Sequence, residues 1–183
     1  GLEYKGKAQV IHLLHLFQEM GTDKTRSLVK RPLHGLRIAP FYGCQILRPH
    51  HILGPESTKE PTILEELIEA AGATALDYGE RLDCCGFHIL LIDEKTSLLM
   101  ASHCLDGAKG IGADLLVTPC TLCHISLDMY QEKAGRSVGK RYGIPVLHLA
   151  QLMGLAFGAY PKEVGIQKLI TSPREVLGSI GLM

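Results

Sequence analysis

Four short runs of apolar residues along this chain have the length and composition of buried strands. They span residues 36–42, 74–78, 114–118 and 144–148. Between them, apolar residues recur every three or four positions, which is the spacing of amphipathic helices. These helical stretches span residues 63–71, 95–108 and 122–133. Strands that alternate with helices pair in parallel through right-handed crossovers. The pattern therefore predicts a three-layer α/β domain with a parallel sheet of roughly four strands.

Both ends of the chain are expected to add helix to this core. Val10, Leu13, Leu14 and Phe17 form one apolar stripe, which predicts a helix over about residues 8–20 that packs into the core or docks a second domain. The segment 160–183 indicates one amphipathic helix and an irregular end. No repeat, low-complexity segment or Gly/Ser linker interrupts the chain. We therefore expect residues 1–183 to form one domain whose α/β core covers about residues 35–157.

Five of the six cysteines stand just beyond the predicted strands. They are Cys44, the adjacent pair Cys84 and Cys85, and the CxxC pair Cys120 and Cys123. The carboxyl ends of parallel strands meet at one edge of a sheet, where open α/β sheets bind their ligands. We therefore expect the five thiols to gather at this edge and to hold a metal centre.

Sulfur ligands select zinc, copper(I) or iron–sulfur clusters. A structural zinc ion and an ordinary iron–sulfur cluster each take four ligands, so five cysteines are one more than either needs. Zinc held by four of the five is one alternative. A dithiol redox site at Cys84-Cys85 or Cys120-Cys123 is another, although it leaves the remaining cysteines unexplained.

Neighbouring residues support a metal centre at this edge. Gly43 and Gly86 adjoin the cysteines and would let the backbone approach a bulky group, because they lack a Cβ atom. Cys120 precedes a predicted helix, whose N-terminal dipole favours thiolates. Cys104 lies inside a helical stretch and is assigned to the core rather than to the ligands.

The cysteine pattern resembles that of the cysteine-rich CCG-domain family, and most closely the C-terminal domain of the heterodisulfide reductase B-subunit. The similarity covers nearly the whole chain, in residues 10–14, 41–44, 48–49, 84–86, 112–114, 120–123 and 151–156. This resemblance implies a noncubane [4Fe–4S] cluster whose ligands are Cys44, Cys84, Cys85, Cys120 and Cys123. It also implies two-electron reduction of a disulfide, such as the coenzyme M–coenzyme B heterodisulfide, to two thiols.

The resemblance further implies partner subunits. The chain has no closely spaced cysteine motifs for cubane clusters, so we expect electrons from a ferredoxin-like cubane-cluster subunit, supplied by a flavoprotein or a membrane cytochrome. The B-subunit resembles a tandem of two such domains, and this chain has one motif. It is thus either an excised half or a separately encoded one that pairs with a second CCG domain. Residues 87–89 are bulkier than is usual in the B-subunit, which predicts a different substrate pocket.

Two other functions remain open. One is a CCG-domain subunit of a succinate, thiol:fumarate or lactate oxidoreductase that passes electrons to a quinone or another carrier. The other is a zinc-stabilised scaffold domain without redox activity, which would unfold when its metal is removed.

Two of the nine histidines adjoin the proposed ligands. His88 and His124 are candidates for protonating a departing thiolate or for donating a hydrogen bond to a cluster sulfur. The other histidines are assigned to packing or solvent contacts. They are His12, His15, His34, His50, His51, His103 and His148.

The composition limits which partners and which cellular location we expect. Lysine plus arginine equals aspartate plus glutamate at 19 each, and no stretch concentrates one sign, so we expect no nucleic-acid partner. No apolar run approaches the roughly 18 to 20 residues that span a bilayer, so we expect no direct membrane insertion. The glycine-rich segment 107–112 precedes a predicted strand, which excludes a dinucleotide fingerprint. Cysteines in metal-type pairs indicate a reducing compartment. We expect a cytoplasmic protein, alone or in a complex that docks at a membrane.

Overall fold

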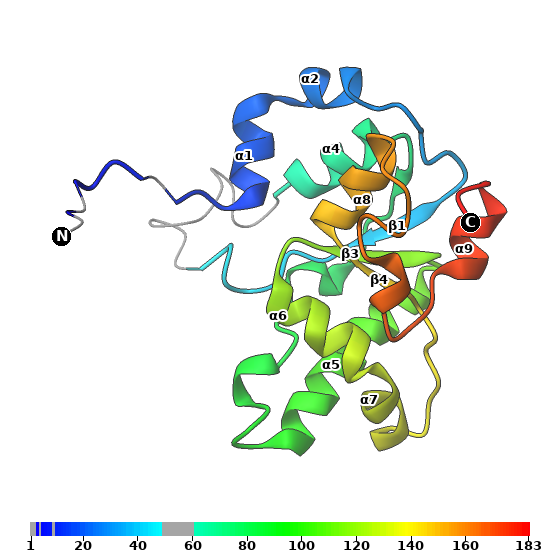
Figure 1. Cartoon of the computed structure of the whole chain (residues 1–183). Helices are drawn as coiled ribbons and strands as arrows, with labels where there is room; N and C mark the ends of the chain where they lie inside the picture. The colour runs from blue at the N-terminus through cyan, green and yellow to red at the C-terminus, as the bar shows by residue number, and fades with distance from the viewer. Residues whose placement is uncertain (1–2, 4, 9, 49–60) are drawn as a thin grey trace.

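A four-stranded, all-parallel sheet in the order β2-β1-β3-β4 forms the centre of the structure, a computed structural model (Figure 1). The structure describes residues 3, 5–8, 10–48 and 61–183. The strands are β1 (Arg37–Pro40), β2 (Thr74–Ala75), β3 (Leu115–Thr118) and β4 (Val146–His148). All four lie within the predicted apolar runs, and the predicted three-layer α/β class is confirmed.

Helices cover both faces of the sheet (Figure 1). One face carries α1 (Leu13–Met20), α2 (Thr22–Ser27), α4 (Ile63–Ala70) and α8 (Leu149–Ala156). The other carries α5 (Glu94–Gly110), α6 (Thr121–His124), which continues as the π-helix η3 (Ile125–Met129), and α7 (Gln131–Ser137). Shorter elements are the 3₁₀ turns η1 (Gly79–Leu82), η2 (Phe87–Ile89) and η4 (Ile166–Lys168), followed by α9 (Arg174–Ser179).

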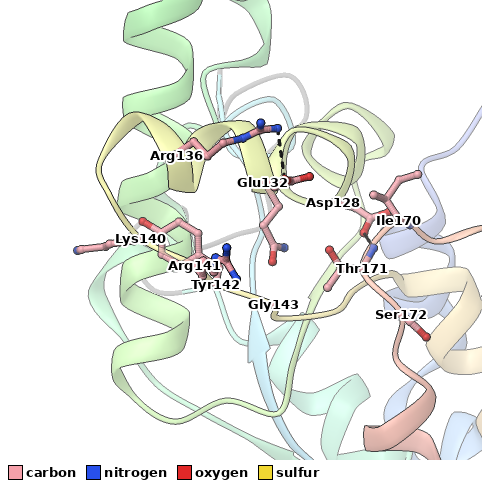
Figure 2. Close-up of a pocket in the computed structure, with 11 residues that line it drawn as sticks. Asp128, Glu132, Arg136, Lys140, Arg141, Tyr142, Gly143, Ile170, Thr171 and Ser172 are labelled. Carbon is pink, nitrogen blue, oxygen red and sulfur yellow. Dashed lines mark hydrogen bonds and ion pairs between the residues drawn. The ribbon is translucent and has the colours of Figure 1, made fainter.

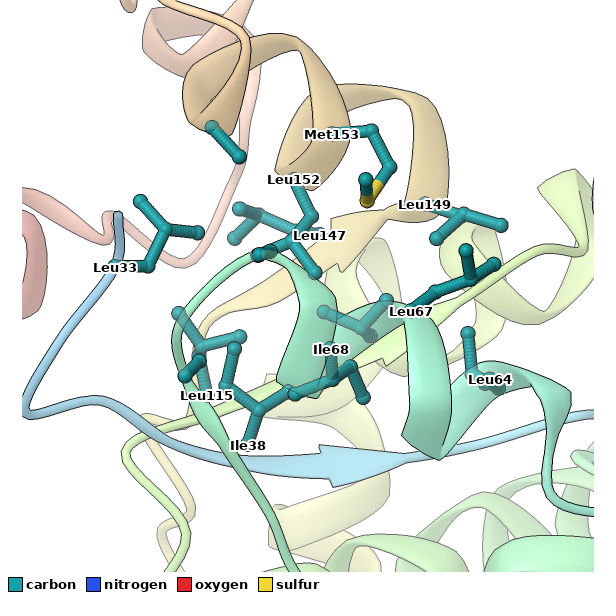
Figure 3. Packing of buried hydrophobic residues seen from close by; sticks show 14 of the residues in the cluster. Leu33, Ile38, Leu64, Leu67, Ile68, Leu115, Leu147, Leu149, Leu152 and Met153 are labelled. Carbon is teal, nitrogen blue, oxygen red and sulfur yellow. The ribbon is translucent and has the colours of Figure 1, made fainter. Parts of the chain in front are cut away.

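Alternate strand residues point into two separate cores. Ile38 and Leu115 pack with α4 and α8 on one face, whereas the next residues, Ala39 and Leu116, pack with α5 on the other. All four are fully buried. A sheet covered on both faces needs continuous apolar strands rather than alternating ones, which is why the short apolar runs were recognisable as strands. Figure 3 shows the core under α4 and α8.

The first helix is shorter than predicted. It begins at Leu13 rather than near residue 8, because the His12 ring accepts the Leu14 N–H at 3.1 Å and caps the helix there. Leu14 and Phe17 are buried as the stripe predicted, but Val10 lies before the helix and is fully exposed. Helix α2 was not predicted. His50 and His51 lie outside the described residues.

The predicted helix over 122–133 is two helices in the structure. After α6 the chain widens into the π-helix η3, and Tyr130, at φ −93° and ψ 3°, separates it from α7. A π-helix accommodates an extra residue in the turn. The buried Asp128 carboxylate accepts the Ile170 and Thr171 N–H groups at 2.9 and 2.8 Å, so this segment also anchors the chain that leads to α9.

No helix in the part of the chain that the structure describes is long and apolar enough to cross a membrane.

A buried polar network lies beneath the end of β1. The Tyr42 hydroxyl accepts the Leu64 N–H at 2.9 Å and donates to the Glu65 carboxylate. Arg81 Nε lies 3.7 Å from Glu65 Oε1. Burial raises the pKa values of Tyr42 and Glu65. Because Gly43 and Cys44 follow directly, this network fixes where the first cysteine leaves the sheet.

We expect Tyr42→Phe to lower the free energy of unfolding by about 1–3 kcal/mol, because it leaves the buried Leu64 N–H and Glu65 without their partner. Urea unfolding of the metal-free protein measures the change. Tyr160→Phe is the control. Tyr160 is 64% exposed, so loss of its hydroxyl should lower the free energy of unfolding by less than about 0.5 kcal/mol. Equal effects of the two substitutions would contradict this role of the hydroxyl.

Candidate metal centre

The three cysteine segments meet beyond the carboxyl ends of the strands. Cys44 follows β1 through Gly43, and Cys120 follows β3 through Pro119. The pair Cys84-Cys85 comes after β2 and η1, and the Tyr42 N–H donates to the Arg81 carbonyl at 3.0 Å, which ties this loop to the first. The topology thus brings together the five cysteines that the sequence singled out, and all five are free thiols.

Cys123 lies between two other sulfurs. Its thiol hydrogen-bonds to both Cys120 and Cys85, and its side chain is buried. The absence of a side chain at Gly43 leaves room for the Cys123 sulfur, because a Cβ atom at this glycine would lie 2.6 Å from Cys123 Sγ. Gly43 adopts φ +75°, so its backbone conformation favours glycine as well.

Hydrogen bonds divide charge unequally among these three thiols. Donation from Cys123 lowers the pKa of Cys120 to about 6, helped by the Cys123 and Leu122 N–H groups. The same donor lowers the pKa of Cys85 to about 7. Cys123 itself has a raised pKa, because it donates to both neighbours and is buried. Hydrogen bonding with Cys123 therefore favours the thiolate form of Cys120 and Cys85 and the protonated form of Cys123.

Cys44 and Cys84 form the second thiol pair. Burial, donation to Cys84 and the nearby negative charges of Cys84 and Cys85 raise the pKa of Cys44 to about 11. Cys104 is different, since it is fully buried within α5 and burial raises its pKa. This agrees with its assignment to the core.

The histidines near the cysteines differ in what they contact. His88, on η2, lies close enough for its charge to lower the pKa of Cys120. His124 instead donates from Nε2 to the Val146 carbonyl of β4 at 3.0 Å. His148, assigned to packing, hydrogen-bonds the Pro119 carbonyl at 3.1 Å and caps α8. It therefore supports the loop that carries Cys120.

Two pockets differ in their relation to the cysteines. A pocket of about 490 Å³ lies beside Cys84, between Arg48 and α5. Leu99, Met100 and His103 of α5 form part of its wall. A second, of about 560 Å³, is lined by α7, the following loop and residues 170–172, and contains no cysteine (Figure 2). Its side chains include Arg136, which pairs with Glu132 at 3.3 Å. The pocket beside Cys84 is the one that adjoins the candidate centre.

The donor set suits a metal–sulfur centre. Within residues 3, 5–8, 10–48 and 61–183, no three or more histidine, cysteine, aspartate or glutamate side chains form a ready-made site for a single metal ion. The thiols instead form the Cys44–Cys84 pair and the group around Cys123, close enough that the Cys85 charge raises the pKa of Cys44. Five sulfurs at one edge match the preference of soft metals and iron–sulfur clusters.

Sequence reasoning missed the residues that hold the cysteine backbone. Ser97 and Ser126 each donate to a carbonyl beside the vicinal cysteines, at 2.9 and 3.0 Å. Neither stands at a spacing that marks a site. The only signal was that Ser126 follows Cys123 by less than one helical turn.

Comparisons with known proteins agree with this geometry. The family model for the cysteine-rich domain, CCG, matches residues 38–128. The membrane anchor subunit of the 8-methylmenaquinol:fumarate reductase of Wolinella succinogenes is 41% identical over 165 residues, which cover 90% of this chain and 58% of that protein. The B-subunit of the ferredoxin/F420H2-dependent CoB-CoM heterodisulfide reductase of Methanosarcina acetivorans is 37% identical over 183 residues, which cover 98% of this chain and 61% of the relative.

The chain thus spans about three fifths of the length of these two relatives. A crystal structure of a hypothetical protein from Helicobacter pylori has the same fold, with a TM-score of 0.63 and 17% identity, over 82% of this chain and 28% of that one. The cysteine pattern, the match to the family model and the similarity along nearly the whole sequence agree. The chain belongs to the cysteine-rich CCG domain family and is similar to the B-subunits of heterodisulfide reductases.

Proposed function

We propose that this chain is the iron–sulfur subunit, or part of it, of a multi-subunit reductase that cleaves a disulfide to two thiols. The observation that carries the proposal is the convergence of five thiols from three chain segments at one edge of the sheet. The relatives that are B-subunits of heterodisulfide reductases support the reaction class. Their names also support partner subunits, among them a ferredoxin-like electron donor.

In this proposal Cys44, Cys84, Cys85, Cys120 and Cys123 hold a noncubane [4Fe–4S] cluster, which when bound supplies electrons for breaking the sulfur–sulfur bond. The pocket beside Cys84 admits the substrate. His88 supplies a proton to a departing thiolate, because its charge acts on Cys120 and an imidazole is a common general acid. His124 positions α6 against β4 through its bond to the Val146 carbonyl.

Metal analysis of anaerobically reconstituted protein tests the cofactor. We expect about four iron and four acid-labile sulfide per chain, with an electron paramagnetic resonance signal after mild oxidation that changes when candidate thiols are added. One zinc and no sulfide would instead leave a scaffold domain, whose unfolding on chelation would show that the metal is structural.

A second function has its own support. The 41% identity to the membrane anchor subunit of a fumarate reductase favours a CCG-domain subunit that exchanges electrons with a quinol. The same oxidised protein distinguishes the two, because a reduced menaquinone analogue rather than a thiol pair should then alter the resonance signal. A response to thiols alone favours the disulfide reaction. Under either function we predict a cytoplasmic protein or one in a membrane-associated complex.

A further inference from the structure

Two successive carbonyls at the vicinal cysteines are held by buried serines. We call the segment Cys84–Phe87 the vicinal turn. Within it, the Cys85 carbonyl accepts from Ser126 Oγ at 3.0 Å, and the Gly86 carbonyl accepts from Ser97 Oγ at 2.9 Å. Ser97 and Ser126 are 1% and 3% exposed, so water has little access to replace either hydroxyl.

A carbonyl that is held in place also fixes the direction of the N–H group on the other side of the same peptide bond. A trans peptide is planar, and its C=O and N–H point in opposite directions. With the Cys85 carbonyl turned toward Ser126, the Gly86 N–H faces Cys84 Sγ at 3.5 Å. With the next carbonyl turned toward Ser97, the Phe87 N–H faces the Cys85 thiol and lowers its pKa.

Close packing prevents the vicinal turn from shifting as a whole. Gly86 has φ +76°, and a Cβ atom there would lie 2.9 Å from the Ser97 carbonyl and 3.0 Å from Met100 Cβ. The turn therefore rests directly on α5. The remaining freedom is rotation of its peptide planes, which the two serine hydroxyls oppose.

We propose that Ser97 and Ser126 are positioning residues that hold two backbone N–H groups of the vicinal turn on the cysteine sulfurs and thereby raise the reduction potential of the metal centre. This inference rests on the proposed function for its effect on potential. Hydrogen bonds to the sulfurs are among the features that set iron–sulfur potentials, and they stabilise the more negative, reduced form.

Ser97→Ala and Ser126→Ala test the proposal, with Ser102→Ala as a matched control. Ser102 lies on the same helix as Ser97, is 2% exposed and donates to the Ala134 carbonyl at 2.8 Å, away from the vicinal turn. In the metal-free protein, hydrogen exchange should accelerate at Phe87 in Ser97→Ala and at Gly86 in Ser126→Ala. Neither amide should change in Ser102→Ala, and Ser126→Thr should restore the Gly86 protection because it keeps the hydroxyl.

Potentiometric titration of the reconstituted variants gives the second readout. We expect a more negative midpoint potential in Ser97→Ala and Ser126→Ala than in the parent and in Ser102→Ala. Unchanged exchange at both amides, or equal changes in all three alanine variants, would overturn the proposal. If the chain takes up no iron and sulfide, the proposed function fails, whereas the exchange pattern still decides whether the serines orient the turn.

Discussion

Cys123→Ser is expected to abolish assembly of the metal centre. The Cys123 thiol contacts both Cys120 and Cys85, and a serine oxygen is a poor ligand for metals that select sulfur. Loss of a partner outside the ligand shell already costs 10–100-fold in metal affinity, so loss of a central ligand should cost at least roughly 100-fold. Iron and acid-labile sulfide after anaerobic reconstitution measure the effect.

Cys104→Ser is the matched control for this loss. Cys104 is also a buried cysteine, but its thiol donates to the Cys84 carbonyl at 3.7 Å rather than to another sulfur. We expect Cys104→Ser to keep the iron and sulfide content of the parent. If Cys123→Ser also kept it, with circular dichroism showing both variants folded, Cys123 would not be a ligand and the five-cysteine set would be wrong.

The gathering of the cysteines was predictable because it depends on topology rather than on detailed packing. Short apolar runs that alternate with helices allow only a few arrangements, and a parallel sheet places Cys44 and Cys120 at the same edge. The burial of Leu14 and Phe17 followed from helical spacing in the same way. For these residues, a periodic pattern carries the structural information.

The missed features depend on contacts that leave no periodic pattern. The His12 ring delays the start of the first helix until Leu13 by accepting a single N–H group, which leaves Val10 outside the helix and exposed. The π-helix and the break at Tyr130 accompany two hydrogen bonds from the distant 170–171 segment to Asp128. Ser97 and Ser126 act on carbonyls that lie 11 and 41 residues away in the sequence. Such contacts arise only once the layers have packed.

Gly43→Ala should be among the most damaging small substitutions in the chain. It combines two costs, because Gly43 has φ +75° and its missing Cβ would lie 2.6 Å from Cys123 Sγ. A left-handed backbone costs a non-glycine residue about 1–2 kcal/mol, and overpacking typically adds about 1–3 kcal/mol. We expect the free energy of unfolding to fall by about 3 kcal/mol in the metal-free protein, measured by urea unfolding.

Gly139→Ala separates the two costs. Gly139 has φ +69°, but a Cβ atom there would meet nothing within 4 Å, so it should lose only the backbone contribution of about 1–2 kcal/mol and should bind metal like the parent. Gly43→Ala should also lose metal under conditions in which it stays folded, because relief of the clash must displace Cys123 or the Cys44 loop. Equal destabilisation by the two substitutions, with equal metal content, would mean that Gly43 is needed only for its backbone conformation and not for its close approach to Cys123. A larger loss at Gly43 on both measures would instead mean that the close approach of Gly43 to Cys123 is what brings the sulfurs of three separate segments within reach of one centre.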